Sequence, residues 1–124
     1  MANFFALPPG VRGAAHFSPD HRFRYWLGRR WDDSLPQFTY VLLNPSAAGG
    51  DRDDPTTRKL RALTVANGGG GYALVNLFAL VDTRQGGLHY PEAIGERREA
   101  NDEWIVKAVE GCDVVVLGLS LIHI

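Results

Sequence analysis

Two apolar, β-prone runs separated by one amphipathic segment constrain this fold more than any other feature of the sequence. Residues 38–43 read FTYVLL and residues 72–77 read YALVNL, which predicts two strands covered on both faces. Between them, residues 55–66 repeat apolar side chains at helical spacing after Asp54, a residue type that caps helices. Residues 38–77 therefore predict a strand, helix and strand joined by the right-handed crossover of a parallel sheet.

Two further strands and a helix complete the predicted sheet. Residues 113–117 read DVVVL, a third buried strand, and Asn101 or Asp102 can cap the helix that precedes it. Residues 22–31 alternate apolar with polar side chains, which predicts a half-buried strand added antiparallel at an edge. Residues 1–20 contain prolines and glycines without a period and predict an irregular lead-in. The predicted fold class is α/β, a three-layer sandwich with a mainly parallel central sheet.

The chain of 124 residues has the length of one domain, which we assign to residues 1–118. The last six residues, LSLIHI, follow a predicted central strand without a helix to cover the sheet, and they look like a translated sequencing adapter. We therefore predict that residues 119–124 are a non-native tail and that the domain is cut off after its third parallel strand. A genuine extra strand or a docked tail is the alternative.

Charge and cysteine content narrow the function classes. A net charge of −1 does not supply the basic field that holds proteins on nucleic acid through phosphates, so any such contact must be local. The single Cys112 excludes an internal disulfide and suits a reducing cytosol. No apolar run approaches the about 20 residues that span a bilayer. We expect a cytoplasmic protein with no membrane partner and leave its oligomeric state open.

Polar side chains follow both strands of the strand–helix–strand unit. The first strand runs into Asn44, Pro45 and Ser46, and the second carries Asn76 and then Phe78. Ligands of open α/β sheets bind at the carboxyl ends of strands, where a carboxamide can orient a water or read the edge of a nucleobase. The alternative is that the first three residues only shape a turn, and that the carboxamide in the second strand only satisfies nearby backbone.

A second group of candidates lies at the predicted starts of the two helices. Clustered aspartates can bind a divalent cation, but this segment does not match a calcium loop, and helix capping explains it better. The free amides of a helix start can hold a phosphate, although neighbouring aspartates would repel it. We predict no metal and no cofactor. These further candidates are Asp53, Asp54, Thr56, Arg58, Asn101 and Asp102.

An alternative function comes from the arginine-rich strand. Its side chains could form a surface that follows a nucleic-acid backbone and stacks bases, without any catalysis. The residues concerned are Arg24, Trp26, Arg29 and Arg30. Amphipathic alternation of an ordinary strand explains the same pattern nearly as well.

The sequence also resembles a known family. The strings RFRYWLGRRW, LLNPSAAGGDRDDPTTRKL and YALVNLFALVDT, with a later Gly95 and Asn101-Asp102, strongly resemble the bacterial and phage family called domain of unknown function 1643. The resemblance runs from about residue 17 to residue 117. Ala47, Ala48 and Gly49 depart from the Thr-Ala-Asp that usually follows NPS in that family, so this chain lacks the family's aspartate there. The family name implies no activity.

A weaker resemblance implies chemistry. LLNPS is similar to the water-positioning GINPG loop of mismatch-type uracil-DNA glycosylases, and LVNLFALVDTR is similar to the segment whose asparagine reads the flipped base in uracil-DNA glycosylases. The resemblance implies a uracil-DNA glycosylase-like sheet, with Asn44 as the catalytic residue that positions the hydrolytic water. It implies that Asn76 recognises the edge of a nucleobase. We add Pro45, Ser46 and Phe78 as substrate-binding candidates, with Phe78 for stacking, although no motif assigns it that role.

Two departures limit that resemblance. Leu42 stands where GINPG begins with glycine, and no HPSP-like motif follows a fourth strand. From the resemblance, we expect complete members of the family to bind a nucleobase, nucleotide or nucleic acid and to hydrolyse an N-glycosidic bond. Because of the two departures, we expect this copy to be an inactive fragment. The alternatives are a non-catalytic nucleic-acid or nucleotide-binding module and a partner-binding structural protein.

Overall fold

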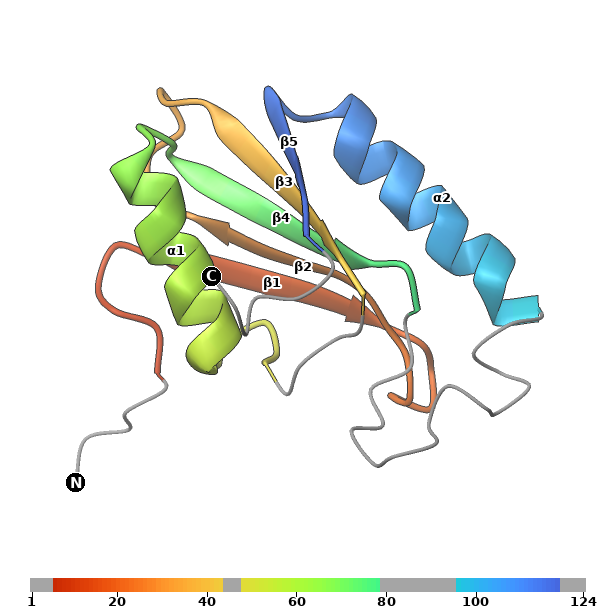
Figure 1. The fold of residues 1–124 in the computed structure, drawn as a ribbon. Helices are drawn as coiled ribbons and strands as arrows, with labels where there is room; N and C mark the ends of the chain where they lie inside the picture. The colour runs from red at the N-terminus through yellow and green to blue at the C-terminus, as the bar shows by residue number, and fades with distance from the viewer. Residues whose placement is uncertain (1–5, 44–47, 79–95, 119–124) are drawn as a thin grey trace.

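The computed structural model describes residues 6–43, 48–78 and 96–118, except for the side chains of 96–98. These residues form one sheet with two helices (Figure 1). The elements in chain order are β1 (Arg12–Phe17), β2 (Arg24–Arg30), β3 (Gln37–Leu42), α1 (Pro55–Ala66), β4 (Gly71–Asn76), α2 (Glu96–Glu110) and β5 (Val114–Leu117). No helix in the described part of the chain is long and apolar enough to cross a membrane.

The sheet is mixed, with strand order β1-β2-β4-β3-β5. β1 pairs antiparallel with β2, and β2 pairs antiparallel with β4, whereas β3 pairs parallel with both β4 and β5. The prediction of a mainly parallel, uracil-DNA glycosylase-like sheet is therefore wrong. Two of the four described strand pairings are antiparallel, and the unexpected one arises because residues 12–17, predicted to be irregular, form a strand that pairs with β2.

β2 lies inside the sheet rather than at its edge, because it pairs with β1 along one edge and with β4 along the other. The sequence hides β1 because Gly13, Ala14 and Ala15 carry too little side chain to show a period of two. As an inner strand, β2 is buried along most of its length. Arg24 and Arg29, which are buried in this strand, must therefore find partners inside the protein, as described below.

The helix α1 begins as predicted. Asp54 is the N-cap, with its carboxylate accepting from the backbone N–H of Thr57, whose hydroxyl accepts in return from the Asp54 N–H. Pro55 follows at the first helical position. α1 packs on the face of the sheet that carries a continuous apolar core. The buried members of that core are Leu27, Phe38, Tyr40, Leu42, Ala48, Leu60, Tyr72 and Leu74.

The helix α2 packs on the opposite face, because adjacent strand residues point to opposite sides of a sheet (Figure 1). Val41 and Val75 contact Ala108 there. α2 begins at Glu96, so the prediction that Asn101 or Asp102 caps it is wrong.

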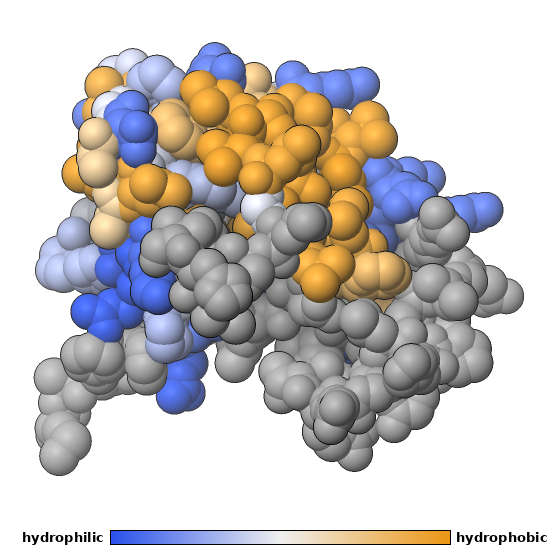
Figure 2. All heavy atoms as spheres, in the orientation of Figure 1, coloured by the Kyte–Doolittle hydropathy of each residue, from blue (hydrophilic) through white to orange (hydrophobic). Residues whose placement is uncertain are grey.

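β5 forms where residues 113–117 predict a strand, but the prediction that it is buried is wrong. Val114, Val115 and Leu117 are 38%, 42% and 78% exposed. β5 is the last strand of the sheet, and no described strand pairs with its outer edge. Figure 2 shows hydrophobic side chains gathered over this strand. The assignment of residues 1–118 to one domain stays a prediction, and residues 119–124 lie outside the described chain.

Candidate functional site

The ends of β3 and β4 lie side by side, as expected of parallel neighbours. Leu42 pairs with Asn76 in the last register position of the two strands. The pairing continues one step further, since the Leu77 N–H donates to the Leu42 carbonyl at 2.9 Å and the Phe78 N–H donates to the Leu43 carbonyl at 3.0 Å. The ends of the two strands at which the site is predicted are therefore adjacent in the sheet.

Part of the predicted site cannot be placed. Asn44, Pro45 and Ser46 lie outside the described residues, and their predicted roles stay predictions. The chain is described up to Leu43 and again from Ala48, which is buried.

Asn76 ends β4 with a buried carboxamide. Its side chain is 1% exposed, and neither Nδ2 nor Oδ1 has a hydrogen-bond partner among the residues that the structure describes. A buried polar atom left unpaired costs about 1–3 kcal/mol, so such atoms in folded proteins call for an explanation. The prediction that this amide merely satisfies nearby backbone has no support in the described part of the chain.

Asn101 lies next to it, on the second turn of α2. Its Nδ2 donates to the main-chain carbonyls of Asn76, at 2.8 Å, and Leu77, at 3.3 Å. The side chain is 3% exposed, and its Oδ1 has no partner within the described ranges. Asp102 follows on the exposed side of the helix. The structure therefore brings two predicted candidates, Asn76 and Asn101, together at one edge. Phe78 is half-buried.

Arg24 begins β2 at the same edge, because β2 runs antiparallel to β4. The register shifts at this point, since His16 faces Trp26 but Phe17 faces Arg24, which makes Tyr25 the extra residue of a bulge. A bulge re-aims the neighbouring side chain, and the Nη1 of Arg24 donates to the Ala48 carbonyl at 2.8 Å. Burial lowers the pKa of Arg24 to about 10, with Asp54 offsetting part of that effect. The guanidinium therefore keeps its positive charge at neutral pH.

Arg29 holds residues 49–53 against β2. Its Nε donates to Asp53 at 3.1 Å, and its two terminal nitrogens donate to the carbonyls of Gly28, Gly49, Gly50 and Arg52 at 2.7–3.2 Å. All five N–H donors of the guanidinium are used. The prediction that Arg24 and Arg29 form a nucleic-acid surface is wrong, since they are 1% and 2% exposed.

Asp53 is the second member of this buried ion pair. It also accepts from Arg61 Nη1 at 2.6 Å and from the Thr57 hydroxyl at 2.9 Å. Burial raises the pKa of Asp53, but the hydrogen bonds from Arg61, Thr57 and Arg29 outweigh it, and the net shift is downward. Asp53 therefore holds α1 to β2 and does not cap the helix.

The start of α1 offers little room for a phosphate. The Thr57 N–H is taken by Asp54, which also accepts from the Ala48 N–H at 3.1 Å. Thr56 is half-buried and Arg58 is exposed on the helix surface. Within residues 6–43, 48–78 and 96–118, no three His, Cys, Asp or Glu side chains are grouped to hold a metal ion.

Sequence reasoning missed Arg24 and Arg29 as buried organisers of the site. Their partners lie 20 or more positions away in the chain, on a segment without a strand or helix. The available signal for Arg24 is its place between Phe23 and Tyr25, whereas Arg29, between Gly28 and Arg30, has no such neighbours.

The comparisons with known proteins agree with one resemblance seen in the sequence. The family described as "Protein of unknown function (DUF1643)" matches residues 24–120, which include β2 to β5. No curated protein and no solved structure matches the chain. The match spans well over half of the 124 residues. The chain belongs to the DUF1643 family.

Proposed function

We propose that this chain is a cytoplasmic protein that binds a nucleobase or a nucleotide where β3 and β4 end. The observation that carries the proposal is the Asn76 carboxamide, which is buried with neither polar atom paired in the described structure. The lone thiol of Cys112 is of the kind kept reduced in the cytosol.

The chemistry of a carboxamide suits a base edge. Its Nδ2 donates and its Oδ1 accepts, side by side in one plane. Each nucleobase presents a donor next to an acceptor on at least one edge, so a single amide can bind it through two parallel hydrogen bonds. A bound base would satisfy both atoms of Asn76 at once and remove the penalty of leaving them unpaired.

Asn101 is a nearby carboxamide whose donor is already used by the fold. Its Nδ2 is used by the backbone of Asn76 and Leu77. Asn76 has no such partner in the described chain. The contrast favours a ligand for Asn76, with the unpaired Oδ1 of Asn101 as a second acceptor nearby.

The surroundings favour a site that is formed before a ligand arrives. Arg24 and Arg29 hold the backbone from Ala48 to Arg52, directly after the predicted Asn44 loop. A site held in place by buried contacts loses less conformational entropy on binding. Phe78 follows Asn76 by two residues, and its half-buried ring suits stacking against a base.

Hydrolysis of an N-glycosidic bond would need Asn44 to orient a water, and that role stays a prediction. We expect this chain to bind without cleavage, because the HPSP-like motif that resembles the charge-stabilising part of glycosylases does not occur in it.

Calorimetric titration tests the proposal. The probes are the four ribonucleosides, their 5′-monophosphates and a short single-stranded oligonucleotide, with ribose 5-phosphate as the probe without a base. We expect at least one base-containing probe to bind and ribose 5-phosphate not to bind at the same concentration. Chromatography of the same mixtures measures released base, of which we expect none.

Two variants assign the binding to its residue. Asn76→Asp keeps the size of the side chain but replaces its donor by an acceptor, so we expect binding to weaken by about tenfold or more. Asn67→Asp makes the same change at the exposed C-cap of α1 and serves as the matched control. Equal binding by wild type and Asn76→Asp, or no binding of any base-containing probe, would refute the proposal.

A second candidate function is association through β5 with another copy of the chain. β5 pairs with β3 on one side, no described strand pairs with its other side, and Leu117 is 78% exposed. Exposed apolar edge strands pair readily with other strands. Light scattering over a hundredfold range of concentration should show a larger mass for wild type than for Leu117→Glu. Leu35→Glu, at an exposed site in the β2–β3 connection, is the control.

A further inference from the structure

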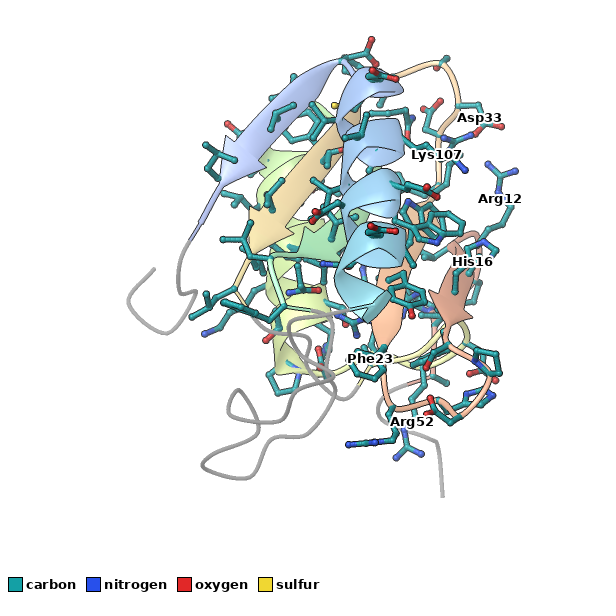
Figure 3. All side chains as sticks on the ribbon, turned by 90° about the vertical axis from the view of Figure 1, so that its right-hand side faces the viewer. Arg12, His16, Phe23, Asp33, Arg52 and Lys107 are labelled. Carbon is teal, nitrogen blue, oxygen red and sulfur yellow. The ribbon has the colours of Figure 1, made fainter. Side chains whose placement is uncertain are left out.

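A cavity of about 380 Å³ lies between the sheet and the last turns of α2. Its lining includes Gln37 and Arg30, at the end of the sheet where β3 begins and β2 ends. The cavity is therefore at the opposite end of the strands from Asn76. Figure 3 views the molecule from the α2 side, with Lys107, Arg12 and Asp33 near this end.

The register of four strands explains why there is space. Ala14 faces Gly28, Gly28 faces Ala73, and Ala73 faces Thr39, so small side chains form one row across the sheet. Thr39, the largest of them, turns its hydroxyl to the Ala108 carbonyl at 2.9 Å. α2 thus contacts this row at Thr39, and the cavity is the space beside that contact.

The indole ring of Trp26 forms one side of the cavity. The indole of Trp26 lies over Gly28, close enough that a Cβ on Gly28 would overlap the ring. The Trp26 ring therefore already covers Gly28, and a flat apolar group in the cavity would lie against that ring. Aromatic pairs gain about 0.5–1.5 kcal/mol beyond the burial of their area.

The mouth of the cavity is cationic. Arg12, Arg30 and Lys107 line it, and Asp33 is the carboxylate that pairs with the two arginines, at 2.6 Å to Arg12 and 3.6 Å to Arg30. Both arginines are exposed on their outer sides, and Lys107 lies over Trp104 at 5.4 Å from the ring centroid. A second carboxylate, that of Asp113, accepts from the backbone N–H of the lining residue Gln37 at 2.8 Å. Three positive side chains and these two carboxylates therefore lie at this end of the sheet.

The carbonyl end of α2 does little to offset that charge. The Lys107 carbonyl accepts from the Gly111 N–H at 3.0 Å, and the Ala108 carbonyl accepts from Thr39. The Val109 carbonyl accepts from the Cys112 thiol at 3.3 Å. Carbonyls that are already paired present less negative charge to a ligand.

From this cavity and its charges we infer a second binding site, for a small flat molecule that carries one carboxylate or phosphate. The flat part lies in this cavity against the Trp26 ring, and the anion faces Arg30, Arg12 and Lys107. A volume of about 380 Å³ is within the range of small-molecule sites. The inference is independent of the proposed function, because no residue of the Asn76 edge contributes to it.

Benzoate and phenyl phosphate are the probes, and benzamide is the neutral control with the shape of benzoate. In titrations followed by amide and indole NMR signals, we expect the signals of Gly28, Ala73 and Trp26 to shift. We expect benzoate or phenyl phosphate to bind about tenfold more tightly than benzamide, because hydrogen bonds to charged groups are the stronger ones. Whichever anion binds more tightly identifies the charged group of the natural ligand.

Variants separate this site from general surface charge. Arg30→Gln and Lys107→Gln should each weaken anion binding by about fivefold to tenfold. Lys59→Gln, which removes an exposed charge from α1 on the other face, should leave it unchanged, as should Asn76→Asp. The inference is overturned if neither anion shifts these signals, if benzamide binds equally well, or if Lys59→Gln weakens binding as much as Arg30→Gln.

Discussion

The side chain of Asn101 is hydrogen-bonded to the main chain of Asn76, with Nδ2 2.8 Å from the carbonyl oxygen. One residue of α2 thus holds the helix to the last residue of β4, which is also the residue with the unpaired carboxamide. The same contact that orients the helix therefore fixes the backbone of the proposed base-reading residue.

Replacing Asn101 should loosen that connection. Asn101→Ala removes a donor from the buried carbonyl of Asn76 and the partly buried carbonyl of Leu77, so we expect the free energy of unfolding to fall by about 1–3 kcal/mol. Urea unfolding followed by circular dichroism measures it. Asp102→Ala, at the exposed neighbouring position, should change stability by less than about 0.5 kcal/mol. Equal effects of the two substitutions would contradict the role of Asn101.

The buried ion pair between Arg29 and Asp53 gives a larger effect. Arg29→Met leaves Asp53 and four carbonyls without this partner, and breaking a buried pair in this way costs about 3–5 kcal/mol. Arg30→Met changes the adjacent but exposed arginine and should cost less than about 1 kcal/mol. If Arg29→Met is no less stable than Arg30→Met in urea, the contacts of Arg29 with residues 49–53 do not stabilise the fold.

Asp53 should also make stability depend on acid. Its pKa is lower in the folded chain than the ordinary 3.8, so folding favours its charged form. The resulting stabilisation is fully present above about pH 5, and it is lost as the pH falls through the folded pKa. Between pH 5 and pH 2, the free energy of unfolding should fall more steeply for wild type than for Asp53→Asn. Parallel curves for the two proteins would show that Asp53 does not titrate differently on folding.

Local signals predicted the strand–helix–strand unit well. The capping side chain of Asp54 and the proline after it mark the start of α1, and the apolar runs mark β3 and β4 to within one residue. These features depend on neighbours in the chain. Asn76 was found as a candidate for the same reason, because a polar residue inside an apolar run is visible in the sequence.

The errors concern contacts between distant segments. Nothing local shows that residues 12–17 pair with β2, and this pairing turns an expected edge strand into an inner one. Arg24 and Arg29 count as polar in any pattern of alternation, yet they are buried by carbonyls of residues 48–52. Asn101 resembles a helix cap by residue type, but its partner is at the end of β4.

The most direct test of the account is to measure both stability and nucleoside binding for Asn76→Leu. Leucine has a similar size and no polar atoms. If the carboxamide is kept for a ligand, its removal should raise the free energy of unfolding by about 1–3 kcal/mol, since unpaired buried atoms disappear. The same substitution should abolish the binding of the nucleoside or nucleotide that wild type binds. A less stable protein that still binds with wild-type affinity would show that Asn76 serves the fold and not a ligand.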